Sequence, residues 1–251
     1  MNQLNIIRQG FVDHPAMDVA VSHAMLEAVA RGELGEVLRL HVPAAVVAFG
    51  RADRVREGYP FAVRAAEAHG FAAVERLAGG RAAVFHEATL AFTWTAPMSD
   101  PRAGIRDRFE SIATTMASAF RSLGVDAHVG EIPGEYCPGQ WSVNVGGRVK
   151  VMGVGQKLVR GAAHVGGVVV VDDGQRIRDV LIPVYRALGL DWDPRTSGSL
   201  ADLAPGLDTN RVTTAILGEL GRRFNLEDSA LPESVIENAS ALISQHLPRV
   251  A

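Results

Sequence analysis

The only cysteine of the chain, Cys137, lies in residues 134–156, GEYCPGQWSVNVGGRVKVMGVGQ, together with Lys150. Pro138 and Gly139 follow the cysteine and predict a turn, where a side chain is more exposed than in the middle of a strand. A cysteine is a useful nucleophile when a nearby cation or hydrogen-bond donor stabilises its thiolate form. The pattern therefore suggests a nucleophilic thiol near Lys150, with a buried, inert cysteine as the alternative.

Lysine usage distinguishes Lys150 from an ordinary surface charge. Lysine and arginine together number 25, yet the only lysines are Lys150 and Lys157. An ammonium is compact enough to fit beside a reacting carbonyl, whereas a guanidinium is broad and forked. The alternation in RVKVMGVGQ places Arg148 and Lys150 on the strand face opposite Val149 and Val151. We expect a site on that polar face, and a solvated strand lysine is the alternative.

A second candidate lies in residues 76–86, RLAGGRAAVFH, where Gly79 and Gly80 stand between two predicted strands. Paired glycines make a tight turn, or they let backbone N–H groups approach an anion or an acyl carbonyl. Arg76 and Arg81 flank the pair and add weight to the second interpretation. Both interpretations remain open at this point.

Two histidines in predicted strands, His86 and His164, are the remaining candidates for chemistry. Neither has a partner at the spacing of metal ligands, and the sequence contains no Walker A, His-Glu-x-x-His or paired Cys-x-x-Cys motif. We therefore predict no metal site, and the simpler interpretation is a pair of strand histidines with satisfied hydrogen bonds.

Composition limits the class of protein. The chain has 251 residues, of which 47% are hydrophobic and 21% charged, as in an ordinary globular protein. The net charge of −3 provides no basic field for nucleic acid. The N-terminal residues lack a signal-peptide pattern, no apolar run is long enough for a membrane helix, and one cysteine fits a reducing compartment. We therefore expect a cytoplasmic protein that binds neither nucleic acid nor membrane.

The elements that must position these residues alternate without a strict β-α-β rhythm. Apolar periodicity and glycine or proline punctuation predict helices within residues 14–32, 61–70 and 104–124 and strands at 4–7, 36–42, 45–51, 72–77, 82–87, 89–95, 140–145, 148–159 and 162–171. The tail after residue 175 is predicted to be mostly helical, with residues 191–206 as a linker. This order favours an α+β fold with a mixed sheet packed on helices.

Three segments together carry a family resemblance. LRLHVPAAVVAFGRAD, RLAGGRAAVFHEATLAFT and VNVGGRVKVMGVGQKL, the last followed by AAHVGG, resemble the lipoate-protein ligase A / octanoyltransferase superfamily, which is related in fold to biotin protein ligases. The resemblance implies a ligase-like catalytic domain over residues 1–190, with a mixed, mostly antiparallel sheet packed on helices. Residues 191–251 would form a short helical C-terminal extension.

The resemblance also implies roles for individual residues. The family pattern Arg-x-x-Gly-Gly followed by a strand ending in His matches Arg76, Gly79, Gly80 and His86, with Arg81 next to the glycines. The family lysine falls on Lys150, which would be catalytic, and Gly153, Gln156 and His164 follow it. These three residues and the group around the glycines would bind substrate. YCPGQWSV resembles the Cys-Pro-Gly turn of the cysteine-dependent octanoyl amidotransferase branch. Cys137 would then carry the acyl group as a thioester, while Lys150 stabilises the thiolate and holds the acyl carbonyl oxygen.

The function implied by the resemblance is transfer of an octanoyl or lipoyl group onto a lysine of a lipoyl domain. The donor would be an acyl carrier protein or a glycine-cleavage H-type protein, and the acceptors would be lipoyl domains of 2-oxoacid dehydrogenases. Thioester aminolysis needs no cofactor. One alternative is an ATP-dependent lipoate-protein ligase, which forms lipoyl-AMP and needs ATP and Mg²⁺. Another is a non-catalytic binder of acylated carriers.

Overall fold

The computed structural model describes residues 1–249. An eight-stranded sheet runs through it in the order β11-β1-β2-β6-β10-β9-β8-β7. Its strands are β1 (Asn2–Ile7), β2 (Val37–His41), β6 (Thr89–Met98), β7 (Ala127–Val129), β8 (Val143–Val145), β9 (Val149–Val159), β10 (Gly161–Val170) and β11 (Phe224–Asp228). The pairs β1–β2 and β1–β11 are parallel, and the other neighbours are antiparallel. The predicted α+β fold with a mixed, mostly antiparallel sheet is confirmed.

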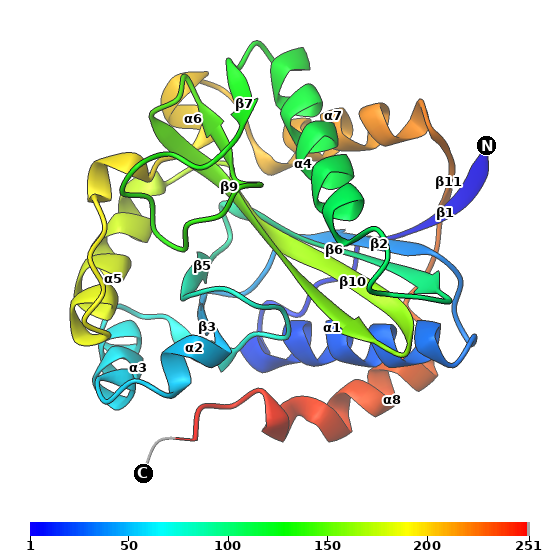
Figure 1. Cartoon of the computed structure of the whole chain (residues 1–251), viewed down its shortest axis with the longest axis horizontal. Coiled ribbons are helices and arrows are strands. Elements are labelled where there is room, and N and C mark those ends of the chain that lie inside the picture. Colours follow the sequence, from blue (N-terminus) through cyan, green and yellow to red (C-terminus); the bar gives the residue numbers. More distant parts are fainter. Residues whose placement is uncertain (250–251) are drawn as a thin grey trace.

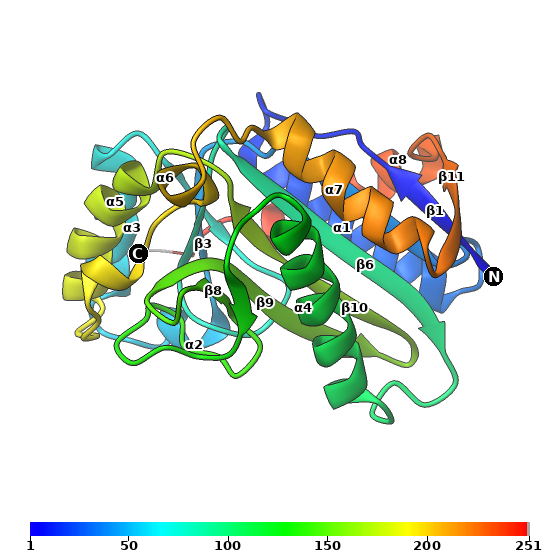
Figure 2. The same cartoon turned by 90° about the horizontal axis from the view of Figure 1, so that it is seen from above.

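Helices cover both faces of this sheet. Figure 2 shows α4 (Ile105–Ser122) and α7 (Thr209–Gly221) on one face and α1 (Pro15–Ala30) on the other, with α8 (Glu233–Leu242) packed outside α1. Pro15 opens α1, where its missing N–H costs nothing. The apolar residues that recur at helical spacing in α1 are all buried: Met17, Val21, Ala24 and Ala28. Within residues 1–249, no helix is both long and apolar enough to cross a bilayer.

A smaller three-stranded sheet lies beside the main one, in the order β4-β3-β5. Its strands are β3 (Val46–Phe49), β4 (Ala72–Glu75) and β5 (Ala83–Phe85), and its neighbouring helices are α2 (Arg51–Arg54), α3 (Tyr59–Ala68) and α5 (Gly174–Ala187) (Figure 1). The strands themselves were predicted, but their separation into a second sheet was not. The turn between β4 and β5 carries the glycine pair at 79–80.

The hairpin between β8 and β9 explains the adjacent glycines at 146–147. Gly146 and Gly147 have φ angles of 58° and 67°, and the N–H of Arg148 donates to the carbonyl oxygen of Val145 at 3.1 Å. Positive φ at both residues is a conformation that glycine adopts without strain, and the loop leaves three residues, 146–148, between the paired Val145 and Val149. This turn sets the register that brings Lys150 of β9 opposite Asn144 of β8.

The C-terminal part contains more than helices. After η1 (Pro194–Thr196) and α6 (Leu200–Leu203), helix α7 leads into β11, which extends the main sheet beside β1, and α8 and η2 (Ile243–Gln245) follow. Strand β11 was not part of the predicted helical extension 191–251, whose last residues, 250–251, lie outside the described residues. The segment predicted as a linker is packed, since residues 196–200 are buried and Ser197 forms a bridge with Lys150 of β9. A domain boundary at residue 190 stays a prediction.

Candidate active site

Cys137 sits in the loop that joins β7 to β8, in an unusual backbone conformation. Its φ angle is 43°, in the left-handed region that residues other than glycine seldom adopt. The backbone N–H of Cys137 donates to the hydroxyl of Tyr185 on α5 at 3.0 Å, and this hydroxyl donates to the carbonyl oxygen of Ala82 at 3.0 Å. Burial raises the pKa of Tyr185 well above its ordinary value, so the phenol keeps its proton for this role. The cysteine is thus held in a strained position by a buried hydrogen-bonded tyrosine.

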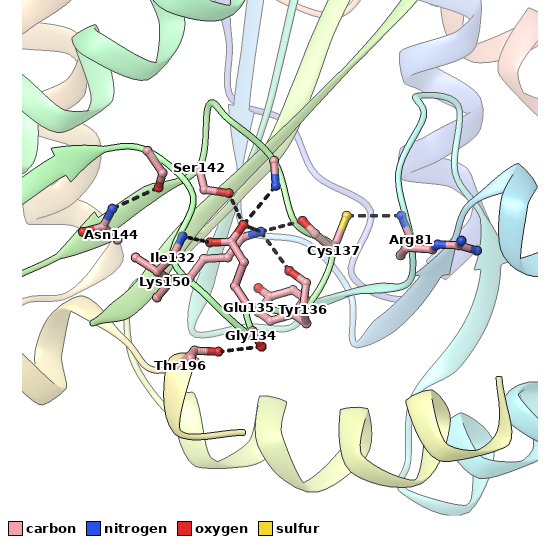
Figure 3. Close-up of polar contacts among 12 residues, drawn as sticks. Arg81, Ile132, Gly134, Glu135, Tyr136, Cys137, Ser142, Asn144, Lys150 and Thr196 are labelled. Atoms are coloured by element: carbon pink, nitrogen blue, oxygen red, sulfur yellow. Dashed lines mark hydrogen bonds and ion pairs between the residues drawn. The ribbon is translucent and has the colours of Figure 1, made fainter. Parts of the chain in front are cut away.

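The glycine turn lies directly beside the thiol. The backbone N–H of Arg81 donates to Sγ of Cys137 at 3.1 Å (Figure 3). Gly80 has a φ of 112°, and a Cβ at this position would lie 3.0 Å from Sγ of Cys137. Residue 80 therefore has to be glycine, both for its backbone and for its contact with the sulfur. The sulfur thus accepts a hydrogen bond from the backbone of the glycine turn.

Arg76 shapes the same turn from inside. One of its Nη atoms donates to the carbonyl oxygen of Arg81 at 2.9 Å, and the other donates to that of Gly79. The guanidinium of Arg81 is turned away from the thiol, toward Asp53 and the carbonyl oxygen of Ala52. Arg76 thus fixes the backbone that presents its N–H to the thiol, and Arg81 contributes that N–H and not its charge.

Lys150 is buried beneath the cysteine loop, with 1% of its surface exposed. Its Nζ donates to Oε1 of Glu135 at 2.9 Å and to the carbonyl oxygens of Tyr136 at 2.9 Å and Cys137 at 2.8 Å (Figure 3). These contacts exclude the solvated strand lysine. The face of β9 that bears Lys150 was expected to be a polar face on which a site could lie, and it is instead covered by this loop. The lysine therefore binds the backbone of the residue that carries the thiol.

Glu135, which the sequence did not single out, is the counterion of Lys150. It is 3% exposed, and its carboxylate accepts from the N–H of Ile132 at 3.1 Å, the N–H of Gly139 at 3.1 Å and the hydroxyl of Ser142 at 2.6 Å. With Lys150, four donors satisfy one buried carboxylate. The only signal in the sequence was the position of Glu135 two residues before the cysteine.

The remaining predicted residues divide into two groups. Gly153 and His164 line the same cavity as Cys137, and a Cβ at Gly153 would lie 3.4 Å from Cε of Lys150. Burial lowers the pKa of His164 to about 3, with the charge of Arg76 as the next cause, so the imidazole is neutral at physiological pH. Its Nδ1 has no hydrogen-bond partner among the described residues. The expectation of a satisfied strand histidine was wrong for this atom.

His86 and Gln156 lie outside the cavity. Nδ1 of His86 accepts from the N–H of Ala88 at 3.2 Å, and its Nε2 has no partner within residues 1–249. The side-chain amide of Gln156 bonds to Arg108 at 3.1 Å and to the carbonyl oxygen of Ile105 at 2.7 Å, at the start of α4. Only the backbone oxygen of Gln156 reaches the glycine turn, where it accepts from the N–H of Gly79 at 3.4 Å.

A cavity of about 100 Å³ opens beside Cys137 and Lys150, between α1, the small sheet and the main sheet. Its walls are mostly apolar side chains from α1, β3, β5, β6 and β10: Val19, Val46, Ala48, Ala83, Phe85, Ala91 and Val168. Gly153 and Gly166 also line it, and an added Cβ would meet Cε of Lys150 at 3.4 Å and Nε2 of His164 at 2.7 Å respectively. A thiol with a hydrogen-bond donor at the mouth of an apolar cavity can take up an apolar acyl group and hold it covalently. Within residues 1–249, no three acidic, histidine or cysteine side chains group to hold a metal ion.

Known proteins are similar to this chain in sequence. A curated octanoyl-[GcvH]:protein N-octanoyltransferase of Geobacillus kaustophilus is 29% identical over 186 residues, covering 74% of this chain but only 65% of its own length. The enzyme of the same name from Bacillus velezensis is 28% identical over 206 residues, covering 81% and 69% of the two chains.

The fold also matches a solved structure, that of lipoate-protein ligase A bound with ATP. The TM-score is 0.78 at 16% identity, over 98% of this chain and 95% of the other. The model of the lipoyl protein ligase A/B catalytic domain matches residues 14–220. By this match the chain belongs to the lipoyl protein ligase A/B catalytic domain family.

Proposed function

We propose that this protein is an acyltransferase that moves an octanoyl or lipoyl group onto a lysine of a lipoyl domain through a thioester on Cys137. The observation that carries the proposal is the position of the Cys137 thiol, which accepts a backbone N–H at the mouth of an apolar cavity. The relatives named as octanoyl-[GcvH]:protein N-octanoyltransferases support octanoyl as the group and a GcvH-type carrier as the donor.

In the first half-reaction, the Cys137 thiolate attacks the acyl carbonyl carbon of the donor. A carbon–sulfur bond forms, and the bond from that carbon to the donor's nitrogen or sulfur breaks, with a proton going to the leaving atom. In the second half-reaction, the neutral amine of the acceptor lysine attacks the thioester carbon. The carbon–nitrogen bond forms, the carbon–sulfur bond breaks, the amine loses a proton and the thiolate is restored. No bond in this sequence requires ATP.

The surrounding residues position the thiol or donate hydrogen bonds to it, and they do not transfer protons among themselves. The N–H of Arg81 stabilises the thiolate, and Gly80 leaves space for the acyl head beside the sulfur. Lys150 is a positioning residue in this proposal, because its Nζ already donates to three protein acceptors. The sequence predicted a direct contact between Lys150 and the acyl carbonyl. That contact requires Nζ to exchange one of its three hydrogen bonds for one to the acyl carbonyl oxygen. His164, which is neutral, contributes a cavity wall.

Intact-mass spectrometry after incubation with an octanoyl-loaded H-type carrier tests the proposal. We expect the mass to rise by one octanoyl group, the adduct to be removed by hydroxylamine, and a lipoyl domain to discharge it. Cys137→Ala should form no adduct and transfer nothing. Full transfer by Cys137→Ala, or lipoylation from free lipoate that stops when ATP and Mg²⁺ are withheld, would contradict the thioester mechanism. Carrier binding without any transfer would identify a binder.

A further inference from the structure

The end of the cavity farthest from Cys137 is polar, although most of its wall is apolar. Asp18 of α1 and His41 at the end of β2 line it, with 8% and 4% of their surfaces exposed. Oδ2 of Asp18 and both ring nitrogens of His41 have no hydrogen-bond partner in the described part of the chain. Nε2 of His41 lies 3.2 Å from Oδ1 of Asp18 but outside hydrogen-bonding geometry. Two buried polar side chains thus line an otherwise mostly apolar space.

Asp18 is fixed in this position by a buried cation. The guanidinium of Arg39, 0% exposed, donates to Oδ1 of Asp18 and also to the Asp18 carbonyl oxygen at 3.1 Å and that of Gln9 at 2.9 Å. Burial opposes the charge of Asp18, but His41 and Arg39 hold the pKa of the carboxyl below its usual value. The carboxylate is therefore ionised, and its position is fixed by Arg39.

Strand register gives the distance across the sheet from Gly153, beside Lys150, to His41. His41 of β2 pairs with Ala91 of β6, Ala91 pairs with Val168 of β10, and Val168 pairs with Gly153 of β9. All four line the cavity, and Gly153 lies against Lys150, which binds the Cys137 carbonyl oxygen. Neighbouring strands are about 4.8 Å apart, so this row spans roughly 14 Å. The cavity wall thus crosses the sheet at right angles to its strands, from Gly153 to His41.

An extended eight-carbon acyl chain fits this row. Its seven carbon–carbon bonds, each about 1.5 Å long and advancing the chain by about 1.25 Å, span roughly 9 Å. The remaining ~5 Å holds the thioester head and the van der Waals radii of the terminal methyl and the imidazole. A twelve-carbon chain, at roughly 14 Å, would push methylenes against Asp18 and His41. There the methylenes would overlap with the buried side chains of Asp18 and His41, and overpacking of this kind is unfavourable.

We propose that Asp18 and His41 form an end wall that limits the acyl chain to about eight carbons. This inference rests on the proposed acyl transfer for its biological meaning, but the wall itself is a property of the cavity. A ligand with one methylene more than its pocket accommodates is disfavoured by about 10–200-fold relative to the ligand that fits. Selection of the octanoyl group would therefore come from the far end of the cavity and not from the thiol.

Binding of straight-chain fatty acids tests the wall independently of catalysis. In Cys137→Ala, we expect the affinity to rise up to octanoate and to fall by about 10-fold or more at dodecanoate. Adding His41→Ala should remove this fall, because the cavity then extends past the ring. Ala91→Leu, which fills the cavity in front of the wall, should move the limit to a shorter chain.

The control is Leu40→Ala, in the residue before His41. Leu40 is 2% exposed in the core on the opposite face of the sheet, so this variant loses packing but should keep the chain-length profile. The wall would be refuted by identical profiles in the parent, His41→Ala and Ala91→Leu. Acyl loading of the wild-type protein with the same chain lengths, measured by intact-mass spectrometry, separates the end wall from the proposed acyl transfer. If the wild-type protein forms no acyl adduct but the variants shift the chain-length profile of fatty-acid binding, the proposed acyl transfer is rejected and the end wall is retained.

Discussion

Replacing Lys150 by methionine tests whether this lysine holds the active-site loop. Methionine has a similar length but no charge and no donor, so the change leaves the Glu135 carboxylate buried with three donors in place of four. The carbonyl oxygens of Tyr136 and Cys137 also lose their Nζ donor. Removing one partner of a buried ion pair typically costs about 3–5 kcal/mol. For a chain of this size, each kcal/mol lowers Tm by about 2–4 °C, so the expected loss is about 6–20 °C.

A second substitution separates the charge from the packing. Glu135→Gln in the Lys150→Met background removes the unpaired buried charge, and the double variant should regain part of the lost Tm. Lys157→Met is the matched control, because Lys157 lies on the same strand but is exposed, and it should change Tm by no more than a surface substitution does. Equal melting of the Lys150 and Lys157 variants, or a double variant no more stable than Lys150→Met, would refute the assignment.

Activity distinguishes positioning from plain stability. Lys150→Arg keeps the charge but not the geometry, and a displacement of the thiol by about 1 Å costs about 100-fold in rate. We expect kcat for acyl transfer, per folded molecule, to fall by about that factor, while KM for the donor changes little. A variant that is merely less stable would show the wild-type kcat once the folded fraction is taken into account. That result would remove Lys150 from the active site.

Two further predictions concern the residues around the thiol. Gly80→Ala should cost about 1–3 kcal/mol of stability, because its φ is 112° and the new Cβ would lie 3.0 Å from the Cys137 sulfur. Gly79→Ala should cost less, because a Cβ at that position meets nothing within 4 Å. Equal chemical-denaturation midpoints for the two variants would contradict this prediction. His164 has a pKa of about 3 when folded and about 6.5 when unfolded, so the unfolded state binds the extra proton and stability falls as pH drops from about 6.5 toward 3, by roughly 2 kcal/mol at pH 5. His164→Asn should flatten that part of the pH–stability curve, and an unchanged slope would show that the histidine is not buried neutral.

Local pattern was enough to predict most elements, because apolar periodicity and glycine position report on each segment by itself. The helix within residues 14–32 and the turn at Gly146-Gly147 follow from such local signals. The burial of Lys150 could not be predicted in this way, because the alternation of β9 shows which residues share a face but not that another loop covers that face. Strand β11 was missed for a similar reason, as five residues with polar positions become a strand only beside β1.

The candidate site was predictable where chemistry concentrates in one segment. Cys137, Lys150 and the glycine pair stand out by composition and turn residues, and the fold brings them together. The residues that complete the site are distant in sequence or look ordinary: Tyr185 approaches from α5, and Asp18 meets His41 only because α1 packs on β2. A buried glutamate such as Glu135 is indistinguishable in sequence from the solvated glutamates of any surface turn.

The structure explains why a chain that otherwise uses arginine keeps a lysine at 150. Three acceptors converge on one point from different directions: Oε1 of Glu135 and the carbonyl oxygens of Tyr136 and Cys137, all 2.8–2.9 Å from Nζ. An ammonium has three donors on a single atom and meets this arrangement, whereas a guanidinium spreads its donors over a flat fork. The opposite case is Arg39, whose Nε and Nη atoms bind separate oxygens of Gln9 and Asp18. Where acceptors diverge the chain uses arginine, and where they converge beneath the nucleophile it uses lysine.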